Sequence, residues 1–241
     1  MVGPGRAPVT VRAGHARVAF ALLVLERHRP VHRDELADAI WGDDLPPTWW
    51  SALRTALARV RLALRAAGLP PDTLVAESGC YVVRLPADAT VDVEVARGGL
   101  ARGAALLDAG DPAAAAAFAE RAAAVLGQPL LPGVEGAWVD AARQPLERDA
   151  LRAYDLLATA RARTGDWPRA IAAADALIAR DPFQERGHLR KMAAYLALGD
   201  RAAALVTYRR CRELLASELG IAPGPELTAL AARAAGHRRP A

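Results

Sequence analysis

The chain has 241 residues, of which 53% are hydrophobic and 24% charged, and its formal net charge is +4. This composition is typical of a folded globular protein and excludes a disordered chain. No run of about 18 apolar residues occurs and the N-terminus lacks the apolar core of a signal peptide, so we expect no membrane segment. The two cysteines, Cys80 and Cys211, make no disulfide framework, which favours a cytoplasmic protein.

The sequence contains no pattern of a catalytic, nucleotide or metal site. Its single lysine, Lys191, is far from any glycine-rich loop, which excludes a P-loop. His28 and His32 are four residues apart, but Pro30 breaks a helix between them and no further metal ligands accompany them. We therefore expect no enzyme, no cofactor and no bound metal.

Three helices are predicted in the first part of the chain. Residues 15–28 are continuously apolar and helical, and residues 32–42 form a short second helix that Gly42 can close. A loop follows, and Thr48 is the expected N-cap of a longer basic helix over residues 48–67.

A β-hairpin is predicted next, and one short strand can precede the first helix. Residues 73–85 read as two short strands around a turn at Ser78-Gly79. Residues 9–14 have room for one strand and part of a turn. The order of helix, short helix, turn, basic helix and hairpin is that of a winged helix-turn-helix.

The basic helix has two different faces. An apolar stripe on one side predicts burial and consists of Trp50, Leu53, Leu57, Val60 and Leu64. Trp49 is expected to pack beside this stripe. The opposite face carries small side chains bordered by arginines. The candidate DNA-binding residues lie on this helix, except for one tyrosine in the hairpin, and they are Ser51, Arg54, Thr55, Ala58, Arg59, Arg61, Arg65 and Tyr81.

This face suits the major groove of DNA. Small side chains permit close approach to the bases, and arginines can contact phosphate or guanine. The alternative is an ordinary surface helix with solvated arginines. The preceding helix and the following hairpin favour the groove.

From residue 91 onward the sequence is helical and repetitive. Gly-Asp pairs stand at 110/111, 165/166 and 199/200, and the last two are 34 residues apart (199 − 165), which is the tetratricopeptide period. In that register Ala170 matches Ala204, and both should be buried where paired helices cross; Cys211 is also expected in the core. The first spacing is 55 (165 − 110), with the extra length in residues 128–149. A plain helical bundle is the alternative.

Both halves resemble known modules. "RDELADAIWGDDLPP" with "ALRTALARVRLAL" resembles the OmpR-like winged helix of response regulators. The segment that begins at "GDWPRAIAAADALIARDP" resembles the bacterial transcriptional activator domain, and its most specific phrase runs from Arg212 to Leu227. Together they resemble the Streptomyces antibiotic regulatory protein family over nearly the whole chain.

The resemblance implies a mainly α protein with two domains. Residues 1–86 would form the winged-helix domain, with a partial or missing N-terminal sheet, and residues 91–238 the tetratricopeptide-like activator domain. It also implies a DNA-binding activator of clustered genes that binds promoter direct repeats, contacts RNA polymerase and performs no catalysis. The family's recognition-helix contacts fall on Ser51, Arg54, Thr55 and Arg59.

Two functions remain open. In the first, the helix over residues 48–67 reads the major groove, and the repeat domain serves self-association as a homodimer or contact with RNA polymerase. In the second, the chain is an interaction scaffold whose decayed winged helix no longer binds DNA. The second is favoured by the reduced sheet, by Glu77, whose charge phosphate would repel, and by Cys80, which replaces a wing glycine.

Overall fold

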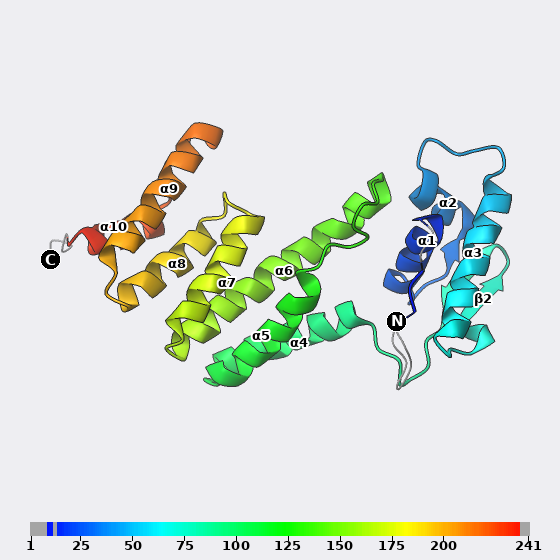
Figure 1. Cartoon of the computed structure of the whole chain (residues 1–241), viewed down its shortest axis with the longest axis horizontal. Coiled ribbons are helices and arrows are strands. Elements are labelled where there is room, and N and C mark those ends of the chain that lie inside the picture. The colour runs from blue at the N-terminus through cyan, green and yellow to red at the C-terminus, as the bar shows by residue number, and fades with distance from the viewer. Residues whose placement is uncertain (1–8, 12–13, 237–241) are drawn as a thin grey trace. The chain divides into compact units, whose positions relative to one another are not determined.

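The computed structural model describes residues 9–11 and 14–236. The fold is mainly α, as predicted, with ten α-helices in the described residues and one small three-stranded sheet. It divides into two compact units (Figure 1). The first comprises the chain up to Glu94 together with Pro129–Leu146, and the second comprises Val95–Gln128 and the chain from Glu147 onward.

The elements up to the hairpin confirm the predicted order. They are α1 (Gly14–Leu25), β1 (Val31–His32), α2 (Arg33–Trp41), α3 (Trp49–Ala66), the short 3-10 helix η1 (Pro71–Thr73), β2 (Leu74–Glu77) and β3 (Cys80–Val83). The remaining helices are α4 (Asp92–Asp108), α5 (Pro112–Leu126), α6 (Ala137–Arg163), α7 (Trp167–Arg180), α8 (Glu185–Ala197), α9 (Arg201–Leu219) and α10 (Pro225–Ala235).

The sheet is antiparallel, in the order β1-β3-β2. Its hairpin turns at Ser78 and Gly79, as predicted, and both have positive φ angles, 51° and 79°. Two positive φ angles in a two-residue loop match the right-handed twist of paired strands. Strand β1 was not predicted, because two residues are too few to show an alternating pattern.

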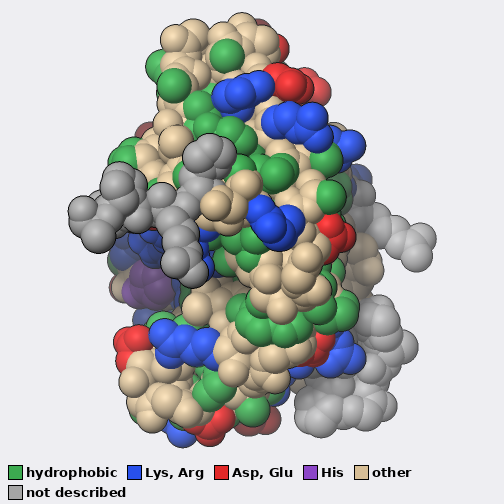
Figure 2. Space-filling model, turned by 90° about the vertical axis from the view of Figure 1, so that its left-hand side faces the viewer, with side chains coloured by type: hydrophobic (Ala, Val, Ile, Leu, Met, Phe, Trp, Pro, Cys, Tyr) green, Lys and Arg blue, Asp and Glu red, His purple; other side chains and the backbone are tan. Residues whose placement is uncertain are grey.

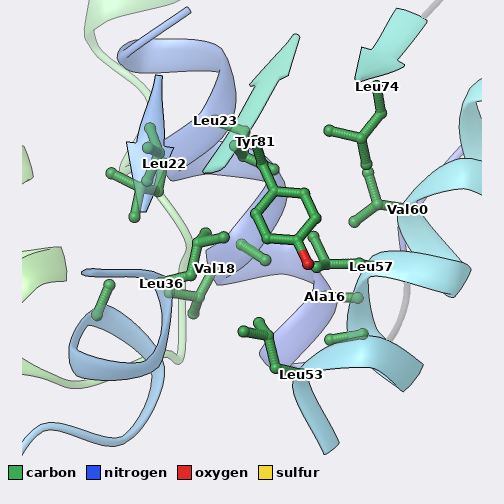
Figure 3. Close-up of a cluster of buried hydrophobic side chains, with 14 of the residues drawn as sticks. Ala16, Val18, Leu22, Leu23, Leu36, Leu53, Leu57, Val60, Leu74 and Tyr81 are labelled. Carbon is green, nitrogen blue, oxygen red and sulfur yellow. The ribbon is translucent and has the colours of Figure 1, made fainter. Parts of the chain in front are cut away.

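One hydrophobic core holds α1, α2, α3 and the sheet together (Figure 3). Its largest buried side chains include Leu22, Leu36 and Leu57, each at most 1% exposed. Residues 9–11 have no regular secondary structure, although Val11 packs against this core. The remainder of the expected N-terminal strand, at residues 12 and 13, lies outside the described residues.

The segment Pro129–Leu146 belongs to the first unit, which differs from the domain boundary expected from the sequence. Val139 is fully buried in the same core as α1 and α3, with Trp138 packed against it. Arg143 donates hydrogen bonds to the carbonyls of Leu131 and Val134, at 2.9 and 2.8 Å. The segment therefore interrupts the repeat array because its apolar residues pack against the winged helix.

The Gly-Asp pairs mark helix-to-helix junctions, as predicted. Gly110, Gly165 and Gly199 have φ angles of 86°, 76° and 78°, which suit glycine because it has no Cβ. Each following aspartate caps the next helix by accepting the backbone N–H three residues on, at 3.0, 3.4 and 2.9 Å. One residue thus ends a helix and the next begins another.

The tetratricopeptide register is consistent with burial in the second unit. Ala170 is 2% exposed and Ala204 is fully buried, as predicted. Cys211 is also fully buried, and burial raises the pKa of its thiol to about 11, which keeps it neutral. Helices α7, α8 and α9 lie side by side in succession (Figure 1).

Candidate nucleic-acid interface

Helix α3 is oriented by its apolar stripe. Leu53, Leu57 and Val60 are at most 1% exposed and point into the core with α1 (Figure 3). These side chains fix the rotation of the helix about its own axis. The opposite face is therefore turned to solvent.

The predicted DNA-binding residues of α3 lie on that solvent face. Arg61 is half-buried at its edge, and the exposed members are Ser51, Arg54, Thr55, Ala58, Arg59 and Arg65. Thr55 donates a hydrogen bond from its hydroxyl to the carbonyl of Ser51, at 3.0 Å. Its methyl group and the oxygen's free lone pairs remain for contact with a base edge.

The arginines of this face have no partner among the residues that the structure describes. Arg54, Arg59, Arg61 and Arg65 make no ion pair and no hydrogen bond with the residues that the structure describes. Helix α3 contains no acidic residue between its first and last positions. Its positive charge is therefore not neutralised by an ion pair within the described residues.

Helix α3 begins after Thr48, as predicted, but without the expected capping hydrogen bond. Thr48 occupies the N-cap position, but its side chain makes no capping hydrogen bond. Trp49 donates its backbone N–H to the carbonyl of Pro46 at 2.9 Å instead. Without a capping side chain or an acidic residue in the first turn, the positive end of the helix dipole favours an external anion.

Trp50 was predicted in the core, and this prediction is wrong. Its side chain is 37% exposed, with the guanidinium of Arg33 5.3 Å from its ring centroid and the ring of Trp49 edge-on at 5.7 Å. Trp49 is half-buried against the core, as predicted. Trp50 lies almost one turn before Leu53, at the start of the helix. Arg33, at the start of α2, is thus a cation beside the first turn of α3 that sequence analysis missed, and it also lies 3.6 Å from the carboxylate of Asp34.

Tyr81 was predicted as a DNA contact, and the structure places it in the core. It is 7% exposed, and its ring points between α1 and α3 (Figure 3). Residues alternate between the two faces of a strand, and on β3 the inward positions are Tyr81 and Val83. Tyr81 therefore anchors the hairpin to the helices and is not available to DNA.

The exposed part of the hairpin is mixed in charge. Glu77 and Ser78 are exposed at its turn, and Arg84 is exposed just after β3. Cys80 is half-buried opposite Glu77 and His32. The wing thus offers phosphate one repelling carboxylate and one attracting guanidinium.

Other kinds of site are not found in the described part of the chain. Residues 9–11 and 14–236 contain no group of three or more His, Cys, Asp or Glu side chains that could hold a metal ion. None of the helices described is both long and apolar enough to cross a bilayer. On the face shown in Figure 2, basic side chains stand singly or in small groups among acidic, apolar and uncharged ones.

The chain belongs to the bacterial transcriptional activator domain family, whose model matches residues 91–234. It is similar to Regulatory protein AfsR of Streptomyces griseus, with 32% identity over 90% of this chain and 22% of the relative. It is also similar to Transcriptional regulatory protein EmbR of Mycobacterium tuberculosis, with 31% identity over 92% of this chain and 58% of the relative. The chain therefore spans less than two thirds of the length of these relatives.

A solved structure extends the similarity to nearly the whole length of this chain. The structure of Mycobacterium tuberculosis EmbR in complex with a low-affinity phosphopeptide matches with a TM-score of 0.85 and 28% identity. The match covers 98% of this chain and 62% of that one. The winged helix and the helical repeats thus follow one another here as they do in a named transcriptional regulator.

Proposed function

We propose that the chain is a DNA-binding transcriptional activator that reads the major groove with α3. The observation that carries this proposal is a solvent face of small side chains with four arginines that have no partner in the described structure. Membership of a transcriptional activator family and relatives named as transcriptional regulators support it. DNA phosphates or guanines would supply the partners that these arginines lack among the described residues.

The test is a titration of the chain with DNA from upstream of the neighbouring genes and with scrambled DNA. Arg54→Ala and Arg59→Ala should weaken binding and leave the fold intact, because neither side chain is buried. If the guanidinium makes two hydrogen bonds to a guanine, its removal should weaken binding by about 1–3 kcal/mol and relax the preference at one base position. If the guanidinium contacts only phosphate, its removal should weaken binding to both DNAs alike and reduce the slope of log affinity against log salt concentration by roughly one.

A matched control is Arg152→Ala in the second unit. Arg152 is also highly exposed, at 72% of its side chain, and pairs with Asp149 at 3.4 Å. Its removal changes net charge by the same amount as removal of Arg54. Equal losses for all three variants would show a general charge effect and contradict readout by α3.

The second candidate function is an interaction scaffold that no longer binds DNA. The exposed carboxylate of Glu77 at the hairpin turn and the lack of a strand over residues 9–11 favour it. Weak and equal binding of both DNAs by the wild-type chain and both variants would make it the better proposal.

The remaining roles follow from the same proposal. Residues 1–86 would bind promoter direct repeats in the cytoplasm, and residues 91–238 would serve homodimerisation or contact with RNA polymerase; residues 237 and 238 lie outside the described residues. Protease cleavage between Leu85 and Val91 tests this division. Because Val139 packs in the core of the first unit, the released C-terminal fragment should expose apolar surface and associate.

A further inference from the structure

Two clusters of charged side chains join α4, α6 and α8 within the second unit. In the first cluster, the carboxylate of Asp149 on α6 lies 2.8 Å from the guanidinium of Arg97 on α4 and 3.4 Å from that of Arg152 on α6. The carboxylate is 15% exposed, whereas the two arginine side chains are 44% and 72% exposed. One largely buried negative charge therefore balances one of two positive charges that reach the solvent.

The second cluster is built in the same way. The carboxylate of Asp155 on α6 lies 2.7 Å from the guanidinium of Arg190 and 3.4 Å from that of Arg186, both on α8. Because α6 pairs with α4 in one cluster and with α8 in the other, the three helices present these side chains on one side of the unit. Each cluster keeps one positive charge after its carboxylate is balanced.

The row of side chains along this side of α6 adds a further cation. Arg148, Arg152, Asp155 and Thr159 are spaced four, three and four residues apart, which places them above one another on the helix. Arg148 is exposed and makes no ion pair or hydrogen bond within residues 9–11 and 14–236. We call the two clusters together with Arg148 the arginine face. Its five guanidiniums exceed its two carboxylates by three charges.

Short side chains continue the rows of α4 and α8 beyond their arginines. These positions are exposed alanines, namely Ala101, Ala104, Ala193 and Ala197. They let the backbone of another chain approach the row on α6. The row on α4 ends with the exposed Asp108, so the positive surface is confined to the end of the face where the arginines lie.

The combination of guanidiniums and carboxylates suits an acidic peptide better than DNA. The phosphates of DNA only accept hydrogen bonds, and the two aspartates would repel them. An acidic peptide carries carboxylates for the guanidiniums and backbone N–H donors for the remaining lone pairs of the aspartates. Alternate side chains of an extended peptide are about 6.8 Å apart, close to the rise of about 6 Å over the four residues that separate the arginines of a pair on α6 or α8.

We propose that the arginine face binds an extended acidic segment of another protein. Carboxylates of that segment pair with Arg148 and Arg152 on α6 and with Arg186 on α8. Its backbone N–H groups donate to the oxygens of Asp149 and Asp155 that face the solvent. The proposal rests on the partner-binding role proposed for the second unit, and not on DNA binding by α3.

The experiment uses the full chain and blocked peptides of about ten residues, in which glutamate alternates with threonine to favour an extended conformation. Matched peptides carry glutamine or lysine in place of glutamate. Fluorescence anisotropy of the labelled peptides measures their affinity. We expect the glutamate peptide to bind, with an affinity that falls as salt is added. The glutamine and lysine peptides should not bind at about 1 mM.

The double variant Arg148→Ala/Arg186→Ala tests the face, and Arg209→Ala/Arg212→Ala on α9 is its matched control. All four arginines are exposed, and each variant removes two positive charges. Arg148 has no ion-pair partner within the described residues and Arg186 lies 3.4 Å from Asp155, so the face variant breaks no close ion pair. It should bind the glutamate peptide at least about fivefold more weakly, because two charge-assisted contacts are lost. The control should bind within about twofold of the wild type.

Charge reversal gives a readout that a folding defect cannot imitate. Arg148→Glu/Arg186→Glu should lose the glutamate peptide and bind the lysine peptide better than the wild type does, because the face then attracts cations. An unchanged affinity for the lysine peptide would contradict the proposal.

Three other results would overturn it. These are no binding of the glutamate peptide at about 1 mM, equal binding of the glutamine peptide, and equal losses in the face variant and its control. If the face variant instead loses more affinity for duplex DNA than the control does, this face contacts phosphate and not a peptide. Loss of peptide binding with DNA binding by α3 intact would remove this proposal alone.

Discussion

The arginines of α3 and those of the second unit carry the same charge but meet different surroundings. Between Trp49 and Ala66 there is no acidic residue, and none of the four arginines in this span has an ion-pair partner within the described residues. In the second unit, many arginines pair with carboxylates of another helix at 2.6–2.8 Å, namely Arg97, Arg161, Arg180 and Arg190. Charge therefore holds helices together in one region and faces solvent in the other.

Arginines that pair within the second unit contribute to folding, whereas the arginines of α3 are available for binding. Asp155 on α6 accepts from Arg186 and Arg190 on α8, which links helices more than 30 residues apart in sequence. Removing such a partner changes the packing of the unit. Removing Arg54 or Arg59 removes no ion pair or hydrogen bond within the described residues, so we expect the main effect of the change on contact with a partner.

The largest expected effect concerns packing in the repeats. Ala204→Leu should lower the free energy of unfolding by about 1–3 kcal/mol, because this alanine is fully buried and the added atoms overpack the crossing helices. Ala58→Leu on the exposed face of α3 should change it by less than about 0.5 kcal/mol. Thermal unfolding followed by circular dichroism measures both. An unchanged Tm for Ala204→Leu would contradict the repeat register.

The second prediction concerns the paired arginines. Asp155→Ala should lower the free energy of unfolding by about 1 kcal/mol, because its largely buried carboxylate bonds two arginines whose charges then lack a partner. Arg59→Ala should leave it unchanged. Denaturant titration of the two variants compares them directly. If Arg59→Ala destabilises as much as Asp155→Ala does, the distinction between paired and solvent-facing arginines fails.

Much of the candidate interface was predictable because it depends on local geometry. The spacing of Leu53, Leu57 and Val60 fixes one side of a helix, and the opposite side then follows from 100° per residue. The Ser78-Gly79 turn and the Gly-Asp junctions were predictable for the same reason. Each depends on the φ angles or hydrogen bonds of only a few neighbouring residues.

The predictions were wrong where contact with a distant segment determines which residues are buried. A helical stripe shows the direction of Trp50 but not how far the core extends along the helix. Alternation in the hairpin defines two faces, but the identity of the inner face, and so the burial of Tyr81, depends on which side the helices pack. The assignment of Val139 to the core of the first unit depends on buried residues that lie more than 50 positions earlier, at Val83 and before it.

The third prediction concerns the wing and rests on the proposed DNA binding. Glu77→Arg should strengthen binding to both DNAs by less than about 1 kcal/mol and steepen the salt dependence by roughly one, because a charge that repels phosphate is reversed. Glu213→Arg on α9 is the control, since Glu213 is also exposed. A salt titration of both variants separates a local from a general effect. Equal gains would show that the hairpin turn does not approach the DNA backbone.

The smallest expected effect concerns an arginine of the first unit that does form ion pairs. Within one unit, arginines therefore differ in pairing from one segment to another. In the same unit as α3, Arg29 bonds both Glu26 and Glu35, and its hydrogen bonds lower the pKa of Glu35. A carboxyl whose pKa is lower in the folded state contributes stability above its ordinary pKa and loses it as the pH falls through the lowered value. Because about two fifths of each of these side chains is exposed, solvent screens the pair and limits its contribution to less than about 1 kcal/mol.

Glu35→Gln should therefore lower Tm slightly at about pH 7, where the carboxylate of the wild type is charged, and the difference should shrink as the pH approaches about 3. Added salt at neutral pH should reduce it as well, because the pair is exposed enough to be screened. Asp43→Asn is the control, since Asp43 is exposed in the loop before α3 and makes no ion pair with the described residues. A penalty for Glu35→Gln that is the same at both pH values would come from lost packing. The ion pairs of Arg29 would then resemble the solvent-facing arginines of α3 in contributing nothing measurable to folding.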